Sequence, residues 1–424
     1  MAFALVLAAV LLLWMSMIYV TLPGRAPYFP RVYASAFSLE VAIVGVLGAI
    51  LGMLLASVPL GVAYAMVALV AGIPIVRIWC TPEVLTGAFG SAVPQAGSRG
   101  MLPRSWGLRL GRVPEASAQR DVPFWTPPGS TRPLLCDVWR PPAGVPPSGL
   151  AFIYFHGSAW VFLDKDFGTR PFFHHLAAQG HVIMDVAYRL YPETGIEGMV
   201  GDVRRSVAWL KANALVYGVN PDRIVIGGGS AGGHIALLAA YTEGHPELTP
   251  PDTRGVDTSV RGVVAWYAPV DLPACYAYYH NDVLAAARPN QPDWNAPPSP
   301  WMRRLLGPGV ERLRFEKASG AGRLDWFLDG SPEQVPARYA LLSPITHARA
   351  GCPPTLMMQG PNDIIAPVAS AKEMRGRLTQ AGVKAALLVL PQVDHGFDLF
   401  ATNWSPSARM SLWHTERFLA LMAA

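Results

Sequence analysis

The sequence predicts an α/β fold with a mostly parallel sheet, preceded by a membrane-embedded helical region. Three observations support this prediction. From about residue 134 onward, short apolar runs alternate with segments of helical periodicity. One such run, 224–226, leads into the glycine-rich turn 227–233 and then into a helix-forming segment. The first 80 residues carry few charges, in a chain that has 51% hydrophobic and only 15% charged residues.

The N-terminal region 1–80 is expected to hold three membrane-spanning helices. Residues 2–20 carry no charge and match the ~20 residues that a bilayer core requires. A cleaved signal peptide is the alternative, but no Lys or Arg precedes the segment, and its apolar run exceeds the ~7–15 residues of a signal sequence. The next apolar stretch is about twice too long for one crossing, and a proline near its midpoint supplies a break. Helices at 39–56 and 60–79 are therefore expected, with one span plus a re-entrant segment as the alternative.

Arginines set the expected orientation of these helices. They cluster after the first expected helix and around the end of the third, at Arg25, Arg31, Arg77, Arg99, Arg104, Arg109 and Arg112. With three crossings both clusters fall on one side, which the positive-inside rule assigns to the cytoplasm. We therefore expect an integral, multi-pass membrane protein with its C-terminal domain in the cytoplasm.

Composition argues against several other classes of protein. The net charge of +5 is spread thinly without a dense Lys/Arg run, so nucleic acid is not an expected partner. The four cysteines (Cys80, Cys136, Cys275, Cys352) form no C-x-x-C pair and are expected to be buried thiols. The histidines lack metal-ligand spacing and no dinucleotide or phosphate motif is evident, so neither a metal nor a cofactor is expected. Nothing in the sequence indicates an oligomeric state.

The segment 81–123 is rich in Pro, Gly, Ser and Arg and is expected to form a linker, which leaves 124–424 as the α/β domain. Its expected strands are 134–139, 150–155, 182–187, 224–226, 262–267, 354–358 and 385–390. Its expected helices are 172–179, 203–217, 234–240, 368–380 and 410–422. The long interval 275–342, rich in aromatic residues and proline, interrupts this alternation. It is expected to form a cap over the active site rather than a surface excursion.

A G-x-S-x-G match at 228–232 puts Ser230 on a tight turn between strand and helix, the context that a nucleophilic serine requires. An ordinary glycine-rich turn is the alternative. A serine nucleophile needs a base beside it, itself held by an acid. Asp363 and His395 follow the last two expected strands, so both should reach the same sheet edge as Ser230, in the chain order Ser, Asp, His.

Two other carboxylates compete with Asp363 for the role of the acid. Asp271 also follows a strand, 262–267, at its carboxyl end. Asp394 adjoins His395 and is expected to point elsewhere, into a hydrogen bond of its own loop.

Attack on a carbonyl builds negative charge on its oxygen, so hydrogen-bond donors must face that atom. We expect the backbone N–H groups of Gly157, Ser158 and Ala231 to form this oxyanion hole. His156 is expected to orient the loop, and Trp160 to line the substrate pocket or pack beneath it.

From about residue 134 to its end, the chain resembles α/β-hydrolases of the hormone-sensitive-lipase-like esterase group, near the BD-FAE-type carboxylesterases. The matching segments are HGSAW at 156–160, YRLYPE at 188–193, YGVNPDR at 217–223, GSAGG at 229–233, SPI at 343–345 and DHGF at 394–397. Ser158 departs from the group by replacing a second glycine, and Gly229 stands where Asp or Glu is frequent. The N-terminal helices lie outside the resemblance, which implies hydrolysis of carboxylic esters without a metal or organic cofactor.

Together these features indicate a membrane-anchored serine esterase or lipase-like hydrolase that acts on lipophilic acyl esters. Ser230 would attack, His395 would act as general base and then acid, and Asp363 would hold the imidazole. An acyltransferase or amidase would use the same residues. A non-catalytic membrane scaffold is the third hypothesis. Loss of the serine, the histidine or the oxyanion glycine would have favoured it, but all three are present.

Overall fold

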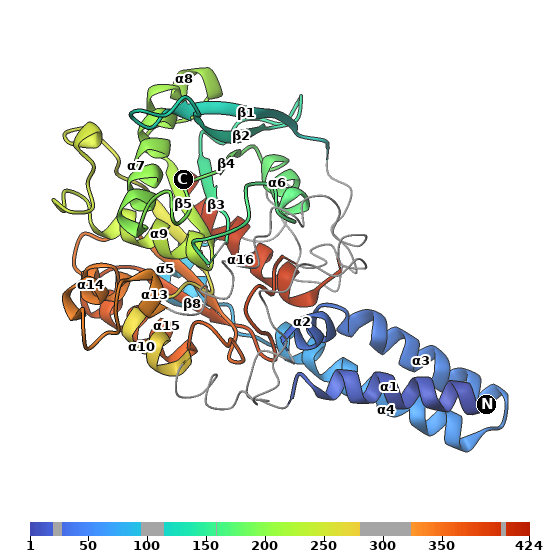
Figure 1. Ribbon diagram of the computed structural model, residues 1–424. Helices are drawn as coiled ribbons and strands as arrows, with labels where there is room; N and C mark the ends of the chain where they lie inside the picture. The colour runs from blue at the N-terminus through green and yellow to red at the C-terminus, as the bar shows by residue number, and fades with distance from the viewer. Residues whose placement is uncertain (20–27, 95–113, 158, 280–323, 400–403) are drawn as a thin grey trace.

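The computed structural model describes residues 1–19, 28–94, 114–157, 159–279, 324–399 and 404–424. Two regions stand out in Figure 1: an α/β domain built on one sheet, and a rod of helices that projects from it. The N-terminus lies at the far end of the rod.

The sheet of the α/β domain has eight strands in the order β1-β2-β4-β3-β5-β6-β7-β8. The strands are β1 (Ser117–Trp125), β2 (Leu134–Arg140), β3 (Ala151–Phe155), β4 (Val182–Val186), β5 (Ile224–Gly229), β6 (Gly262–Trp266), β7 (Thr355–Gln359) and β8 (Ala385–Val389). The β1–β2 and β2–β4 pairs are antiparallel and all other pairs are parallel. The mostly parallel sheet expected from the sequence is therefore present.

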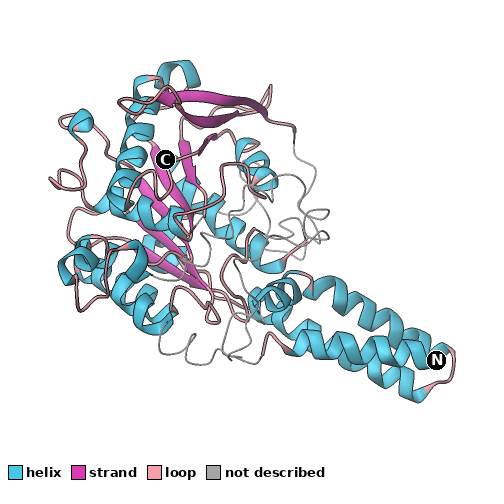
Figure 2. Cartoon of the chain, viewed as in Figure 1, coloured by secondary structure: helices cyan, strands magenta, loops and turns pink. Residues whose placement is uncertain are grey.

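Helices cover both faces of this sheet (Figure 2). Successive side chains of a strand point to opposite faces, so alternate residues belong to two separate apolar cores, each of which the helices on that face cover. The helices of the domain are α5 (Leu85–Phe89), α6 (Arg170–Ala177), α7 (Ile196–Ala212), α8 (Ala214–Tyr217), α9 (Ala231–Tyr241), α10 (Leu272–Tyr278), α13 (Leu324–Phe327), α14 (Pro336–Leu341), α15 (Val368–Gln380) and α16 (Pro406–Ala423). In β3, Ile153 and Phe155 join the core under α7, α9 and α15, whereas Phe152 and Tyr154 join the core under α6 and α16. Short 3-10 turns are η1 (Gly90–Ala92), η3 (Pro251–Thr253) and η6 (Pro344–His347).

The expected linker 81–123 is not a plain linker. It contains α5, η1 and most of β1, so the α/β domain starts before residue 124. Strand β1 was not predicted from the sequence, because it is a largely exposed edge strand that contains Arg120 and Asp121 and lacks a continuous apolar run. The four cysteines are free thiols, but Cys80 is exposed, contrary to expectation.

The rod consists of α1 (Ala2–Ser16), α3 (Ser38–Leu54) and α4 (Val58–Trp79), which lie side by side, with α2 (Tyr28–Ala36) where the rod meets the α/β domain (Figure 1). The closest approach is between α3 and α4. A Cβ added at Gly45 would lie 2.4 Å from the backbone nitrogen of Ala68, and one at Gly52 would lie 2.3 Å from that of Gly61. Small residues thus let the two backbones touch.

The expectation of three membrane-spanning helices is wrong. Within the described ranges, only α4 is long and apolar enough to cross a membrane, and a second candidate exists only if α2 and α3, bent by 68°, count as one span. Since α1 has 15 residues and α3 has 17, they extend about 22 Å and 25 Å, short of a ~30 Å hydrocarbon core. A multi-pass membrane localisation is therefore not supported. The predicted cytoplasmic orientation of the C-terminal domain required three crossings, so it is not supported either.

The expected cap, 275–342, is described only in part, because residues 280–323 lie outside the described residues. Its described part comprises most of α10 together with α13 and α14.

Candidate active site

Ser230 lies at the turn between β5 and α9, with φ +53° and ψ −123°. The flanking glycines are required by the close approach of β3. A Cβ at Gly228 would lie 2.1 Å from the carbonyl oxygen of Phe155, and one at Gly232 would lie 1.9 Å from the same atom. The positive φ of Ser230 makes this turn strained. The serine side chain lies half-buried on it, at the carboxyl edge of the sheet.

His395, on the loop after β8, connects Ser230 to Asp363, on the loop after β7. The imidazole Nε2 lies 2.8 Å from the Ser230 Oγ, and Nδ1 lies 2.9 Å from the Asp363 Oδ2. The three side chains thus form one hydrogen-bonded chain across the carboxyl ends of three strands.

Asp363 is buried, and groups at the end of β7 and in the following loop hold its carboxylate. Oδ2 also accepts a hydrogen bond from the Gln359 side chain at 2.7 Å. Oδ1 accepts the backbone N–H groups of Ile365 and Ala366, both at 2.8 Å. These donors hold the carboxylate in the orientation that faces His395.

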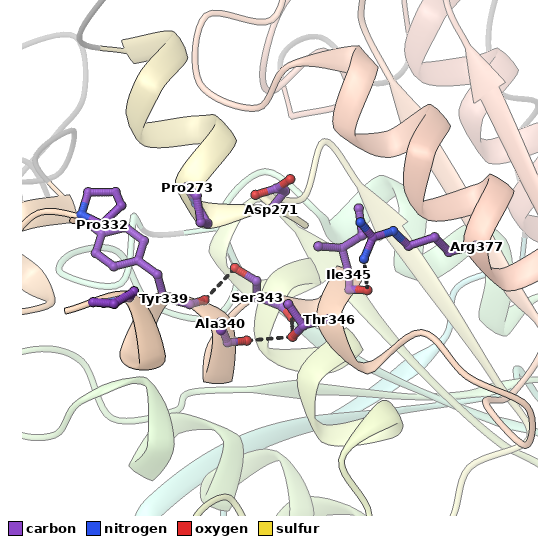
Figure 3. A pocket seen from close by; sticks show the side chains of 10 residues that line it. Asp271, Pro273, Pro332, Tyr339, Ala340, Ser343, Ile345, Thr346 and Arg377 are labelled. Atoms are coloured by element: carbon purple, nitrogen blue, oxygen red, sulfur yellow. Dashed lines mark hydrogen bonds between the residues drawn. The ribbon is translucent and has the colours of Figure 1, made fainter. Parts of the chain in front are cut away.

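The competing carboxylates have other partners. Asp271 caps the N-terminus of α10 by accepting the Ala274 N–H at 3.0 Å. It lines a pocket of about 280 Å³ with Tyr339, Ser343 and Arg377 (Figure 3). Asp394 accepts its neighbour's backbone N–H within its own loop, as expected.

Gly157 is in contact with the turn that carries Ser230. A Cβ there would lie 3.1 Å from the carbonyl oxygen of Gly229 and 3.3 Å from the Cβ of Ser230. Ala231 is the first residue of α9, where backbone N–H groups lack intrahelical acceptors. Ser158, the third expected donor, lies outside the described residues. The oxyanion hole therefore stays a prediction. Gly157 and Ala231 lie beside Ser230, as this prediction requires.

His156 is buried and packs against Tyr188. The two rings stack with centroids 4.6 Å apart, and the Tyr188 hydroxyl donates to the His156 carbonyl oxygen at 2.9 Å. Burial lowers the pKa of His156 to about 4, so its ring is neutral near pH 7. This environment agrees with a loop-orienting role.

Trp160 is buried between α9 and α13. Its indole N–H donates to the His234 Nδ1 at 3.3 Å, and its ring stacks on that of Phe327 at 5.5 Å. The His234 Nε2 in turn lies 2.8 Å from the carbonyl oxygen of Leu342. Burial lowers the pKa of His234 to about 4, so the neutral ring accepts at Nδ1 and donates at Nε2.

Tyr267, at the end of β6, was not singled out by sequence reasoning. Its ring centroid lies 4.6 Å from that of His395, and its hydroxyl donates to Asp398. A Cβ at Gly229 would lie 2.7 Å from this hydroxyl, which explains why glycine occupies that position. Burial raises the pKa of Asp398 to about 6. The only available signal was an aromatic residue at the last position of an expected strand, 262–267.

Comparisons with known proteins agree with this architecture. Residues 136–294 match the BD-FAE family, and residues 314–417 match the Prolyl oligopeptidase family. Similar proteins include two from Mycobacterium tuberculosis. "Probable carboxylic ester hydrolase LipM" is 31% identical over 287 residues, covering 67% of this chain and 57% of LipM. "Esterase LipQ" is 28% identical over 306 residues, covering 70% of this chain and 63% of LipQ. The match thus spans about three fifths of the length of these curated relatives.

Solved structures of esterase 2 from Thermogutta terrifontis are also similar. The form phosphonylated by sarin has a TM-score of 0.51 at 21% identity, covering 73% of this chain and 95% of that one. The native form has a TM-score of 0.51 at 22% identity, covering 72% and 92%. At these identities the likeness concerns the fold, and the α/β domain described above has the α/β-hydrolase fold.

Proposed function

We propose that this protein is a serine carboxylesterase that cleaves carboxylic esters through an acyl-enzyme. One observation carries the proposal: the hydrogen-bonded chain from Ser230 through His395 to Asp363, at 2.8 and 2.9 Å. The names of the similar proteins LipM and LipQ, a carboxylic ester hydrolase and an esterase, support the same reaction class.

In the first half-reaction the Ser230 Oγ attacks the ester carbonyl carbon while the His395 Nε2 takes its proton. Asp363 stabilises the imidazolium that forms. The oxyanion accepts hydrogen bonds from the backbone N–H groups of Gly157, Ser158 and Ala231, the three donors predicted from the sequence. When the C–O bond breaks, His395 returns the proton to the leaving alkoxide, and the acyl group remains on the serine.

In the second half-reaction water replaces the alcohol. His395 takes a proton from water, the hydroxide attacks the acyl carbon, and the tetrahedral intermediate expels the Ser230 oxygen. The proton held by His395 goes back to that oxygen. The products are a carboxylic acid and the free enzyme.

The substrate is proposed to be a lipophilic ester and the rod to associate with lipid. Large apolar side chains stand exposed along α1, α3 and α4, among them Phe3, Val6, Leu13, Leu47, Leu54 and Val58. An exposed apolar surface of this extent marks a site of interaction with protein or membrane. The scarcity of charge on these helices favours lipid as the partner: α1 has no charged residue, and α3 and α4 have one each, Glu40 and Arg77.

Active-site labelling tests the reaction. The full chain in detergent is treated with a fluorophosphonate probe and assayed on p-nitrophenyl esters of increasing acyl length. Ser230→Ala should abolish labelling and lower kcat by a factor on the order of 10⁴–10⁶. Ser259→Ala, at an exposed serine, is the matched control and should label normally. Labelling that persists in Ser230→Ala would assign the nucleophile to another residue.

Flotation tests the lipid association. The wild type should float with phosphatidylcholine vesicles, and the double variant Leu47→Glu/Leu54→Glu should remain largely in the soluble fraction. The control is Leu215→Glu, at a leucine of α8 that is 95% exposed on the α/β domain. Equal flotation of the double variant and the control would contradict the proposal.

A further inference from the structure

The helix α2 reaches the loops that carry the proposed acid and base. Arg31, in α2, is only 2% exposed and pairs through its guanidinium NH2 with the Asp394 Oδ2, which belongs to an equally buried side chain. The two residues are 363 positions apart in the chain. Figure 1 shows α2, the helix that contains Arg31, at the junction between the rod and the α/β domain.

The other oxygen of Asp394 connects the two loops. Its Oδ1 accepts the backbone N–H of His395 at 2.8 Å and that of Ile364 at 3.3 Å. Ile364 directly follows Asp363. One carboxylate therefore bridges the loop of the base and the loop of the acid, and Arg31 is its buried counter-ion.

A second contact links the rod to the acid loop. The side-chain amide of Asn362 donates to the carbonyl oxygen of Ile18, just beyond the end of α1, at 3.1 Å. Ile18 is buried. Thus the chain around α1 and α2 contacts residues adjacent to both Asp363 and His395.

We infer that the N-terminal helical region positions the acid and base loops of the triad, chiefly through the buried Arg31–Asp394 ion pair and also through Asn362. This inference rests on the proposed esterase function. Arg31 does not contact the reacting atoms, so it is a positioning residue. Removing its charge would leave the Asp394 carboxylate buried without its cation, and the carboxylate would have to move or take up a proton. Either change disturbs the loop of His395, and a displacement of about 1 Å in such a constellation costs about 10²-fold in rate.

The test compares Arg31→Met with wild type in the full chain, in detergent, on one p-nitrophenyl ester. We expect kcat to fall about 10- to 100-fold while KM changes less than about two-fold, and the rate of fluorophosphonate labelling to fall in parallel. Arg31→Lys, which retains the positive charge, should recover most of the loss. Arg77→Met is the control: it removes an exposed arginine of α4 and should keep kcat within about two-fold.

A double variant separates positioning from a folding defect. Arg31→Met/Asp394→Asn removes both charges, so neither is left unpaired, and it should fold even if Arg31→Met does not. Its kcat should still lie about ten-fold or more below wild type, since the link to α2 is gone, and the two substitutions should not be additive. A folded double variant with wild-type kcat would overturn the inference without touching the proposed function. Activity retained by Ser230→Ala would instead contradict the function itself.

Discussion

The two sides of Ser230 are held in different ways. On the side of the predicted oxyanion hole, called here the oxyanion side, the loop that contains His156 and Trp160 is held by Tyr188, by His234 and by Phe327 of α13, all within the α/β domain. These contacts are neutral hydrogen bonds and ring stacking. On the acid–base side, the loops of Asp363 and His395 share the carboxylate of Asp394, whose counter-ion comes from α2.

This difference has a physical consequence. A neutral hydrogen bond contributes about 0.5–1.5 kcal/mol, and its loss is partly absorbed by local rearrangement. Breaking a buried ion pair by removing one partner is more damaging, because it leaves an uncompensated charge. The acid–base side should therefore be the more sensitive of the two, and it depends on a segment from the other end of the chain.

Among the variants that compare the two sides, the largest effect is expected at Asp363, the proposed acid. Asp363→Asn should lower kcat by about 10⁴-fold, because the neutral amide carries no charge to stabilise the imidazolium, and its NH2 group, facing Nδ1, would favour the wrong imidazole tautomer. Asp271→Asn should leave kcat within about two-fold, since Asp271 caps α10 and lines a separate pocket. Steady-state kinetics on one ester measures both. The reverse ranking would move the acid to Asp271.

The two sides should respond to acid in opposite directions. His156 and His234 have folded pKa values lowered to about 4 by burial, from an ordinary 6.5. Between pH 4 and pH 6.5 each histidine binds a proton in the unfolded chain but not in the folded chain. Each histidine therefore lowers the free energy of unfolding as the pH falls from 6.5 to 4. For Asp394, burial outweighs the nearby Arg31 and raises the pKa from 3.8 to about 6. The folded chain then holds the extra proton, so this group adds stability as the pH falls from 6 to 3.8.

Urea unfolding between pH 4 and 7 measures this contrast. The loss in free energy of unfolding caused by His234→Gln should shrink as the pH falls, whereas the loss caused by Asp394→Asn should grow. Plotted against pH, each of these differences has a limiting slope of about 1.4 kcal/mol per pH unit. Slopes of the same sign in both variants would contradict the assignment of charge states on the two sides.

The smallest effect is expected from Tyr188→Phe, which removes one hydrogen bond to the His156 carbonyl oxygen and keeps the ring stack. The free energy of unfolding should fall by about 1 kcal/mol and kcat by no more than about three-fold. Urea unfolding and ester kinetics provide the two measurements. A loss in kcat as large as that of Arg31→Met would remove the proposed asymmetry between the two sides.

Much of the α/β domain could be predicted because its strands are buried on both faces. Segments such as 151–155 and 224–226 read as continuous apolar runs for that reason. The exposed edge strand β1 has no such pattern and was missed. Apolar composition was a poorer guide to the rod, since hydropathy reports which side chains avoid water but not where a helix ends. The α1 helix ends at Ser16, inside the segment expected to span a membrane.

The sequence by itself determined the turn around Ser230 and the strand-end placement of Asp363 and His395, because both depend on local patterns: glycine spacing and apolar runs of strand length. Only the tertiary structure decided which carboxylate faces the imidazole, since Asp271, Asp363 and Asp394 all lie near strand ends and differ only in orientation. Tertiary structure alone also brought Arg31 to Asp394. Contacts between residues so far apart in the chain depend on how whole elements pack, and packing leaves no periodic pattern in the sequence.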